Sequence, residues 1–121
     1  MIGIDIVEIS RLKALIKDRG FLDKVYTDEE IEYCGSAKSD HLKASRFANR
    51  FAAKEAIFKA VDKLDALYWK EIQILNEPSG KPVVTFSGKT KKVMQENKLN
   101  IELSLSHSRQ FAVAAAMCVR G

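Results

Sequence analysis

Asp5, Glu55 and Lys59 are the side chains of this sequence whose types and surroundings could support chemistry. Asp5 lies among Ile, Gly and Val, where an unpaired carboxylate is costly to bury, so it needs a cation, hydrogen-bond donors or a metal. A structural ion pair and a functional role are both open for it. Glu55 and Lys59 are four positions apart in a helical segment and therefore face the same side. For most such pairs the explanation is a solvated salt bridge.

Lys54 precedes this pair in an unusual setting. At about 100° per residue, an apolar stripe runs along the helical segment through Phe47, Phe51, Phe58 and Val61. Lys54 falls in the middle of this stripe, so its amine either extends past the aromatic rings or meets a buried anion. Arg46 and Arg50 precede it at four-residue intervals. Three cations without an intervening acid repel one another, and a phosphate would relieve that repulsion.

The elements that must position these residues follow from the hydrophobic pattern. The opening residues alternate as a half-buried strand does, with one face formed by Ile2, Ile4 and Ile6 and the other by Gly3, Asp5 and Val7. The remaining pattern predicts helices over residues 40–64 and 88–97, and strands over residues 72–75, 83–86, 101–105 and 111–119. The sequence therefore predicts a single α+β domain over residues 1–121, with a mostly antiparallel sheet packed on a long helix.

Capping residues predict two short helices between the first strand and the long helix. Ser10 is the expected N-cap of a helix over residues 11–19, and Gly20 is its expected stop. Residues 27–30 begin with Thr and end with Glu, which is the capping-box pattern. We expect that box to start a helix ending near Gly35.

The composition excludes several classes of protein. Hydrophobic residues make up 46% and charged residues 30%, which excludes a disordered chain. No apolar run approaches the roughly 18 residues of a membrane span, and no secretory signal pattern opens the sequence. The two cysteines match no metal or redox spacing. We therefore expect a cytoplasmic protein, whose net charge of +4 suits an anionic ligand or an acidic partner better than nucleic acid.

Four motifs, in order along the chain, resemble the holo-[acyl-carrier-protein] synthases, the small bacterial branch of the 4′-phosphopantetheinyl transferases. They are IGIDIVEI at residues 2–9, RFAAKEAIFKA at 50–60, SGKP at 79–82 and SLSHS at 104–108. Any one motif alone is weak, but their order and spread over nearly the whole chain are specific. The segment between Gly35 and Ala44 and the basic segment 88–97 carry no motif.

The resemblance implies a group transfer. The 4′-phosphopantetheine arm of coenzyme A (CoA) would move to a serine of an acyl carrier protein in fatty acid biosynthesis, releasing adenosine 3′,5′-bisphosphate. In the family an aspartate and a glutamate hold Mg²⁺, and here they correspond to Asp5 and Glu55. Two carboxylates suit Mg²⁺, which keeps several waters and binds phosphate oxygens. Lys59 would offset transition-state charge. The general base is left open between Glu55 itself and a metal-bound water.

The resemblance also assigns ligand and partner contacts. The expected CoA-binding residues are Arg50, Lys54, Lys59, Gly80, Lys81, Pro82, His107 and Ser108, with Arg46 a further candidate for the phosphates. On generic grounds alone, residues 80–82 are turn residues and His107 is a structural histidine. Arg11 matches a family arginine that receives the acidic carrier protein. Members of the family are homotrimers with the active site between subunits. We expect no nucleic-acid or membrane partner.

Two other functions remain as alternatives. A metal-dependent nucleotide or phosphodiester hydrolase would use the same carboxylates and cations, but the sequence has no further acidic cluster for a second metal. A non-enzymatic RNA-binding module is the second alternative. Only 8% of the residues are aromatic, the phenylalanines of the long helix are hidden, and no RNA-binding motif is present.

Overall fold

The computed structural model describes residues 1–61 and 67–121. The elements, in chain order, are β1 (Ile2–Glu8), α1 (Ile9–Leu15), α2 (Arg19–Val25), α3 (Asp28–Gly35), α4 (Asp40–Ala60), a 3-10 turn (Trp69–Glu71), β2 (Ile72–Asn76), β3 (Pro82–Phe86), α5 (Gly88–Glu96), β4 (Leu99–His107) and β5 (Phe111–Arg120). Within the described ranges, no helix is both long and apolar enough to cross a membrane.

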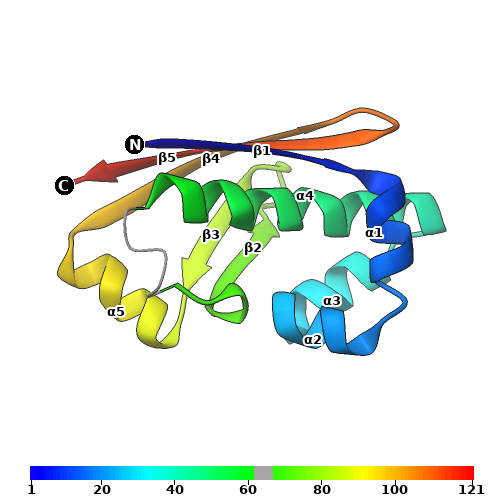
Figure 1. Ribbon diagram of the computed structural model, residues 1–121, viewed down its shortest axis with the longest axis horizontal. Coiled ribbons are helices and arrows are strands. Elements are labelled where there is room, and N and C mark those ends of the chain that lie inside the picture. The colour runs from blue at the N-terminus through cyan, green and yellow to red at the C-terminus, as the bar shows by residue number, and fades with distance from the viewer. Residues whose placement is uncertain (62–66) are drawn as a thin grey trace.

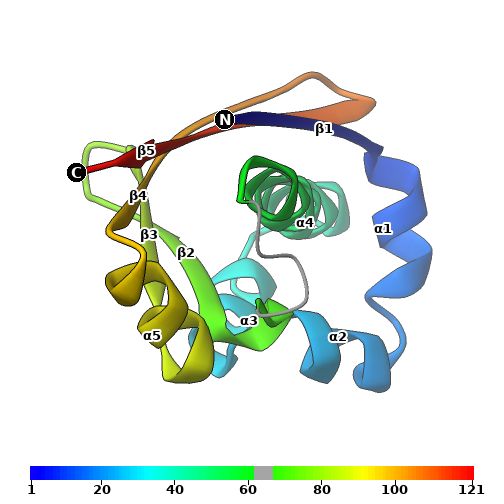
Figure 2. The ribbon, with the colours of Figure 1, turned by 60° about the vertical axis from the view of Figure 1, so that its left-hand side comes forward.

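Helix α4 is the central layer of the molecule (Figures 1 and 2). A three-stranded antiparallel sheet, in the order β1-β5-β4, covers one side of it. The antiparallel hairpin β2–β3 lies on the other side, together with α2, α3 and α5. The predicted α+β class and the long helix are confirmed, but the strands form two sheets, where one was expected.

The sheet approaches α4 closely because its inner face carries small residues. Ala112, Ala114 and Ala116 of β5 are all buried. A Cβ atom added to Gly3 would lie 2.0 Å from the backbone oxygen of Ala56, so only glycine fits there. The Gly3–Asp5–Val7 face of β1 therefore points inward, while Ile2, Ile4 and Ile6 point outward and are 65%, 60% and 60% exposed.

The aromatic stripe of α4 packs on the opposite side from this sheet. Phe51 stacks on Trp69 with ring centroids 5.2 Å apart, and Phe58 meets the same indole edge-on at 4.7 Å. Phe47 packs edge-on against Tyr26 at 4.9 Å. Both sides of α4 are thus buried, which fixes the rotation of the helix and the direction of each charged side chain on it.

Two of the predicted helix boundaries are confirmed. The side chain of Ser39 caps α4 by accepting a hydrogen bond from Leu42 N at 3.0 Å. Thr27 and Glu30 form the expected capping box at the start of α3. At its other end α4 stops at Ala60, where Val61 is extended, and the rest of the predicted helix up to Leu64 lies outside the described residues.

The predicted helix 11–19 is wrong in its boundaries. α1 starts at Ile9, follows Glu8 without a side-chain cap, and ends at Leu15. Asp18 then caps a separate helix, α2, by accepting from Gly20 N at 2.8 Å. Gly20 is therefore the second residue of a helix and stops none. The sequence signal for this break was Asp18. Its side chain caps a free backbone amide at the start of α2, whereas Gly20 does not end the preceding helix.

Candidate active site

Asp5 and Lys59 meet where β1 passes α4. Lys59 Nζ donates to the Asp5 carboxylate at 3.2 Å and to the backbone oxygen of Ile4 at 3.0 Å. The Lys59 side chain is 52% exposed and that of Asp5 is 17% exposed. The cation that Asp5 was expected to need is therefore Lys59. The pair also stays open to a ligand.

Glu55 completes this charged group, one helical turn before Lys59. Partial burial and the nearby negative charge of Asp5 raise the pKa of Glu55, while Lys59 and Arg11 oppose that rise. A raised pKa makes a carboxylate a better proton acceptor, and the contribution of Asp5 places a second anionic group near Glu55. The described residues contain no cluster of three or more metal-ligating side chains, so this site offers a metal only two carboxylates.

Arg11 of α1 borders the same group. Its charge acts on Glu55, and its guanidinium lies 5.8 Å from the centre of the Phe51 ring. The residue is exposed on the outer side of α1. Arg11 is thus placed on the rim beside the carboxylates, where it can meet a partner without moving them.

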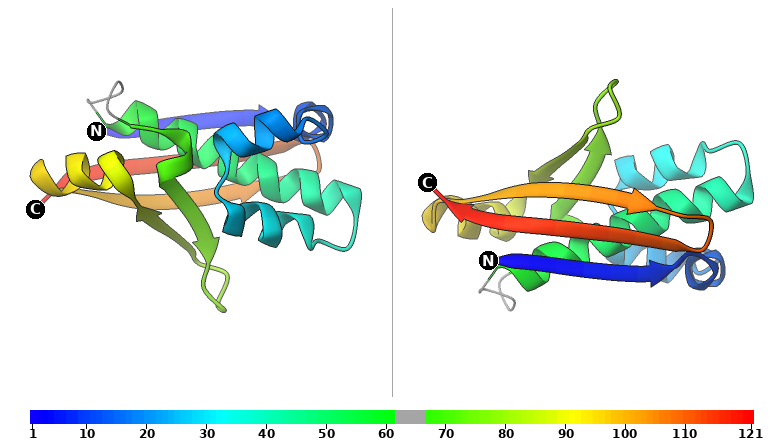
Figure 3. Two further views of the ribbon diagram at one scale, coloured as in Figure 1. Left: turned by 90° about the horizontal axis from the view of Figure 1, so that it is seen from below. Right: turned by 90° about the horizontal axis from the view of Figure 1, so that it is seen from above.

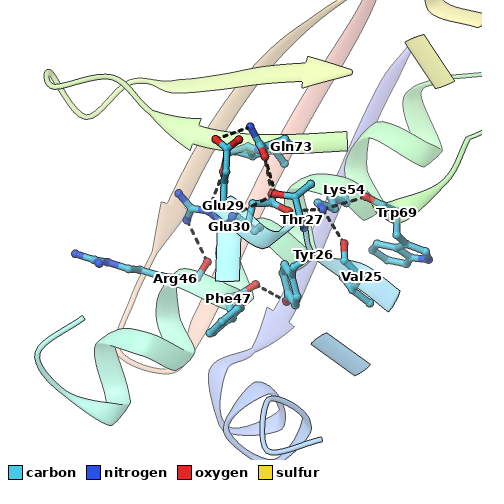
Figure 4. A network of polar contacts seen from close by, with 12 residues as sticks. Val25, Tyr26, Thr27, Glu29, Glu30, Arg46, Phe47, Lys54, Trp69 and Gln73 are labelled. Carbon is cyan, nitrogen blue, oxygen red and sulfur yellow. Dashed lines mark hydrogen bonds and ion pairs between the residues drawn. The ribbon is translucent and has the colours of Figure 1, made fainter. Parts of the chain in front are cut away.

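Lys54 lies on another face of α4 and has a different role (Figure 4). Its Nζ donates to Glu30 Oε1 at 2.7 Å, to Val25 O at 2.7 Å and to Trp69 O at 3.0 Å. Neither side chain of the Lys54–Glu30 pair has any exposed area. The buried anion expected opposite Lys54 is therefore Glu30. All three donors of Lys54 are occupied, which contradicts the prediction that Lys54 contacts CoA.

Arg50 is also a structural residue. It is buried, and its guanidinium donates to Ile74 O at 2.9 Å, to Arg46 O at 3.2 Å and to the Asn76 side-chain oxygen. These contacts join α4 to the end of β2 and give Arg50 a structural role. Its predicted contact with CoA stays a prediction. Arg46 is tied down too, since its NH1 donates to Tyr33 O at 3.1 Å.

The turn with the SGKP motif joins β2 to β3. Gly80 has a φ of +93°, a conformation that favours glycine. Gly80 N donates to Glu77 O, and Glu77 N donates to Lys81 O, both at 2.8 Å. Gly80 and Lys81 are exposed and Pro82 is half-buried, so the turn stands free for a ligand. Their predicted contact with CoA stays a prediction.

His107 and Ser108 lie at the turn between β4 and β5. His107 is exposed, and with Ser108 it lines a hollow of about 360 Å³ whose other wall is the start of α4, at His41, Leu42 and Ser45. The Ser108 hydroxyl accepts from Phe111 N at 3.1 Å and so also holds the turn. A larger hollow of about 800 Å³, between β3, α5 and β4, contains none of the predicted site residues.

The predicted site residues lie in separate parts of the molecule. Asp5, Glu55 and Lys59 lie beside β1. The SGKP turn projects from the opposite edge of the molecule (Figure 3), and β4 with His107 is the sheet edge away from β1. A single chain therefore does not bring all the predicted site residues together.

The chain matches the family model of the 4′-phosphopantetheinyl transferase superfamily over residues 1–116. The chain belongs to this superfamily. A holo-[acyl-carrier-protein] synthase of Ruminiclostridium cellulolyticum is 43% identical to it, and the match covers 100% of this chain and 92% of that protein. The corresponding synthase of Koribacter versatilis is 40% identical, with coverage of 95% and 94%. The chain is therefore an enzyme of the transferase class.

Solved structures of the same family share this fold. A Bacillus anthracis holo-(acyl-carrier-protein) synthase in complex with CoA (3′,5′-ADP) matches with a TM-score of 0.81 and 31% identity, over 99% of this chain and 96% of that one. The Helicobacter pylori synthase in complex with coenzyme A has a TM-score of 0.82 and 32% identity, over 98% and 100%. The architecture of this transferase is thus that of the holo-[acyl-carrier-protein] synthases.

Sequence reasoning missed two residues that organise this transferase. Glu30, the partner of Lys54, lies 24 positions away and was recognised only as part of a capping box. Asn76, which accepts from Arg50, was not singled out at all. The signal for Glu30 was present, because a lysine inside an apolar stripe requires an anion, but periodicity along one helix does not say which element supplies it.

Proposed function

We propose that this enzyme transfers the 4′-phosphopantetheine group of CoA to a serine of an apo-acyl carrier protein and releases adenosine 3′,5′-bisphosphate. The observation that carries the proposal is the convergence of Asp5, Glu55 and Lys59 at one open site of a chain whose family is that of the holo-[acyl-carrier-protein] synthases. The CoA complexes of the related synthases support the choice of donor.

Mg²⁺ is the metal that these residues fit. Asp5 and Glu55 offer two carboxylate ligands. Burial and the charge of Asp5 raise the pKa of Glu55, and a divalent cation would relieve the repulsion between the two carboxylates. A pair of carboxylates, with the remaining positions left to water and phosphate, is the usual protein share of a Mg²⁺ site. When bound, Mg²⁺ would neutralise negative charge on the pyrophosphate of CoA and orient it.

The side chains then divide the work of the transfer. The serine oxygen of the carrier protein forms a bond to the phosphorus that bears the pantetheine arm, and the bond from that phosphorus to the leaving phosphate oxygen breaks. Glu55 would take the serine proton, directly or through a water, because its carboxylate lies in the same open site as Asp5 and Lys59. Lys59 faces the same space and offsets charge that develops on the phosphate oxygens.

The enzyme would work as a homotrimer in which a second copy completes each site. In one chain, His107 lies on the edge strand away from β1, and the turn at residues 80–82 projects from the opposite edge of the molecule, so both lie apart from the carboxylates. The outward face of β1 and β5 carries exposed apolar residues, Ile2, Ile4, Ile6 and Met117, and a second copy would cover it. His107, Ser108 and the Gly80–Pro82 turn of one copy would then bind the CoA held by the carboxylates of the next.

The carrier protein would approach over α1. Arg11 projects beside Glu55, and Lys13 follows on the same short helix, which suits a strongly acidic partner. We place the activity in the cytoplasm and in fatty acid biosynthesis, because these follow from the substrate.

Intact-protein mass spectrometry tests the proposal. An apo-acyl carrier protein incubated with the enzyme, CoA and Mg²⁺ should gain the mass of one phosphopantetheine, and EDTA should abolish the gain. Asp5→Ala and Glu55→Ala should remain folded and lose at least about 100-fold in rate. No mass gain with several carrier proteins, from folded wild-type enzyme, would contradict the proposal. Cleavage of CoA without transfer would then identify the hydrolase.

A further inference from the structure

The SGKP turn is held in place by a chain of hydrogen bonds that begins on α4. The Arg50 guanidinium donates to the side-chain oxygen of Asn76, and Asn76 Nδ2 donates to the backbone oxygen of Gly80 at 2.9 Å. Both ends of one amide are therefore used, one toward the helix and one toward the turn. This chain is a direct polar connection from the buried body of the enzyme to the tip of the hairpin.

The anchored end of this chain is rigid. Arg50 is buried, its Nε donates to Ile74 O at 2.9 Å, and its guanidinium carbon lies 4.8 Å from the centre of the Tyr33 ring. Arg46 stacks on the same ring at 4.4 Å. A planar guanidinium held by an aromatic ring and a carbonyl has little freedom, so it fixes the oxygen of Asn76 in one direction.

The free end needs this support. Residues 76–81 are all exposed, so packing does not set the shape of the turn. Asn76 is opposite Pro82 in the strand register, next to the position where Glu77 N donates to Lys81 O. Hydrogen-bonded and non-hydrogen-bonded pairs alternate in an antiparallel ladder, so the backbones of Asn76 and Pro82 do not bond to each other. The side-chain amide of Asn76 therefore adds a link to the turn at a position where the backbone ladder has none.

We propose that Arg50 and Asn76 are positioning residues, which hold the Ser79–Pro82 turn in the conformation that binds CoA. This inference rests on the proposed function, because the role of the turn in CoA binding does. Arg50 acts on the ligand through Asn76 and the backbone of Gly80.

Asn76→Ala tests the inference without disturbing the core, since Asn76 is exposed. The KM for CoA should rise about 5-fold, as expected when a hydrogen bond worth about 1 kcal/mol is lost. The kcat and the KM for the carrier protein should not change. In hydrogen exchange, the amides of Gly80 and Lys81 should lose protection. Asn100→Ala is the matched control, because Asn100 is also an exposed strand residue, and its amide donates to Gly121 O at 3.4 Å.

Asn76→Asp separates positioning from a merely structural role. The carboxylate keeps an acceptor for Arg50 but loses the donor to Gly80, so the variant should show the raised KM for CoA with wild-type thermal stability. A wild-type KM in Asn76→Asp, or unchanged exchange at Gly80 and Lys81 in Asn76→Ala, would overturn the inference. If the wild-type enzyme itself neither bound CoA nor transferred its arm, the proposed function would fail, and the exchange data alone would decide whether Asn76 holds the turn.

Discussion

Two lysines of helix α4 pair with carboxylates of other elements, and the two pairs differ in burial and in the distance between their charged atoms. Lys54 and Glu30 are both fully buried and 2.7 Å apart, whereas Lys59 and Asp5 are partly exposed and 3.2 Å apart. The two lysines are five residues apart on one helix, which turns them about 140° away from each other. A single motif, residues 50–60, thus contains a residue that holds the fold and residues to which we assign the reaction.

Burial explains why the Lys54–Glu30 pair holds the fold and the Lys59–Asp5 pair stays open to a ligand. In the Lys54–Glu30 pair, the carboxylate also accepts from Thr27 N and Ile74 N at 2.9 Å each, so Glu30 joins α3, α4 and β2. Burial lowers the pKa of Lys54 and the charge of Glu30 opposes that change, so the ammonium depends on its partner. A ligand could reach this pair only by unfolding its surroundings. The Lys59–Asp5 pair has no such cover.

The largest effect should come from breaking the buried pair. Lys54→Met leaves the Glu30 carboxylate buried without a cation, which should reduce the free energy of unfolding by about 3–5 kcal/mol. Denaturant titration followed by circular dichroism measures the loss. Adding Glu30→Gln to Lys54→Met should recover part of it, because the amide oxygen still accepts from Ile74 N without carrying a charge. A double variant no more stable than Lys54→Met would contradict this explanation.

Lys59→Met should have the opposite effects, with a large loss of activity and a small change in stability. The activity should fall about 10- to 100-fold, because a cation that faces developing charge is lost. The free energy of unfolding should fall by about 1 kcal/mol or less, far less than in Lys54→Met, because Lys59 is 52% exposed although Asp5 is only 17% exposed. Lys92→Met is the matched control, since Lys92 forms an exposed pair with Glu96 at 3.9 Å. Equal activity in the two variants would show that Lys59 has no role in the reaction.

Local signals in the sequence predicted the parts of the fold that are local in origin. The Thr27–Glu30 capping box and the β2–β3 hairpin were found because each depends on a few neighbouring residues. The break between α1 and α2 was missed, because the residues Asp18 and Gly20 are compatible both with the end of one helix and with the start of the next. Periodicity also left open which face of β1 is buried. The choice depends on Gly3 meeting α4, a contact across more than fifty residues.

The candidate site could be predicted only in part for the same reason. Glu55 and Lys59 share a helix face by spacing alone, but their closeness to Asp5 came from the family resemblance. Arg50 and Lys54 were assigned to CoA from their position in the motif, and burial now gives both of them structural partners. Spacing along α4 identified which side chains point together. It did not reveal what lies opposite them.

The smallest expected effect is on the pH dependence of stability, measured in metal-free protein. The raised pKa of Glu55 means that the folded state binds more protons than the unfolded state, whose glutamate pKa is about 4.3. Stability from this residue is therefore present below that pH and is lost as the pH rises through the folded-state pKa. Glu55→Gln should thus be more stable than the wild type at pH 7, by less than about 1 kcal/mol for a half-exposed group, and equal to it near pH 4.

Adding Mg²⁺ at pH 7 should reverse this difference. Binding at ten times its Kd stabilises the wild type by about 1.4 kcal/mol, and Glu55→Gln has lost one of the two carboxylates that the metal needs. Thermal unfolding in EDTA and in Mg²⁺ measures both effects, with Glu102→Gln as the control at an exposed glutamate of β4. If Mg²⁺ stabilised Glu55→Gln as much as the wild type, the metal would not be bound by Asp5 and Glu55. The open site of Asp5, Glu55 and Lys59 would then be distinguished from the buried Lys54–Glu30 pair, because its stability would respond to the metal.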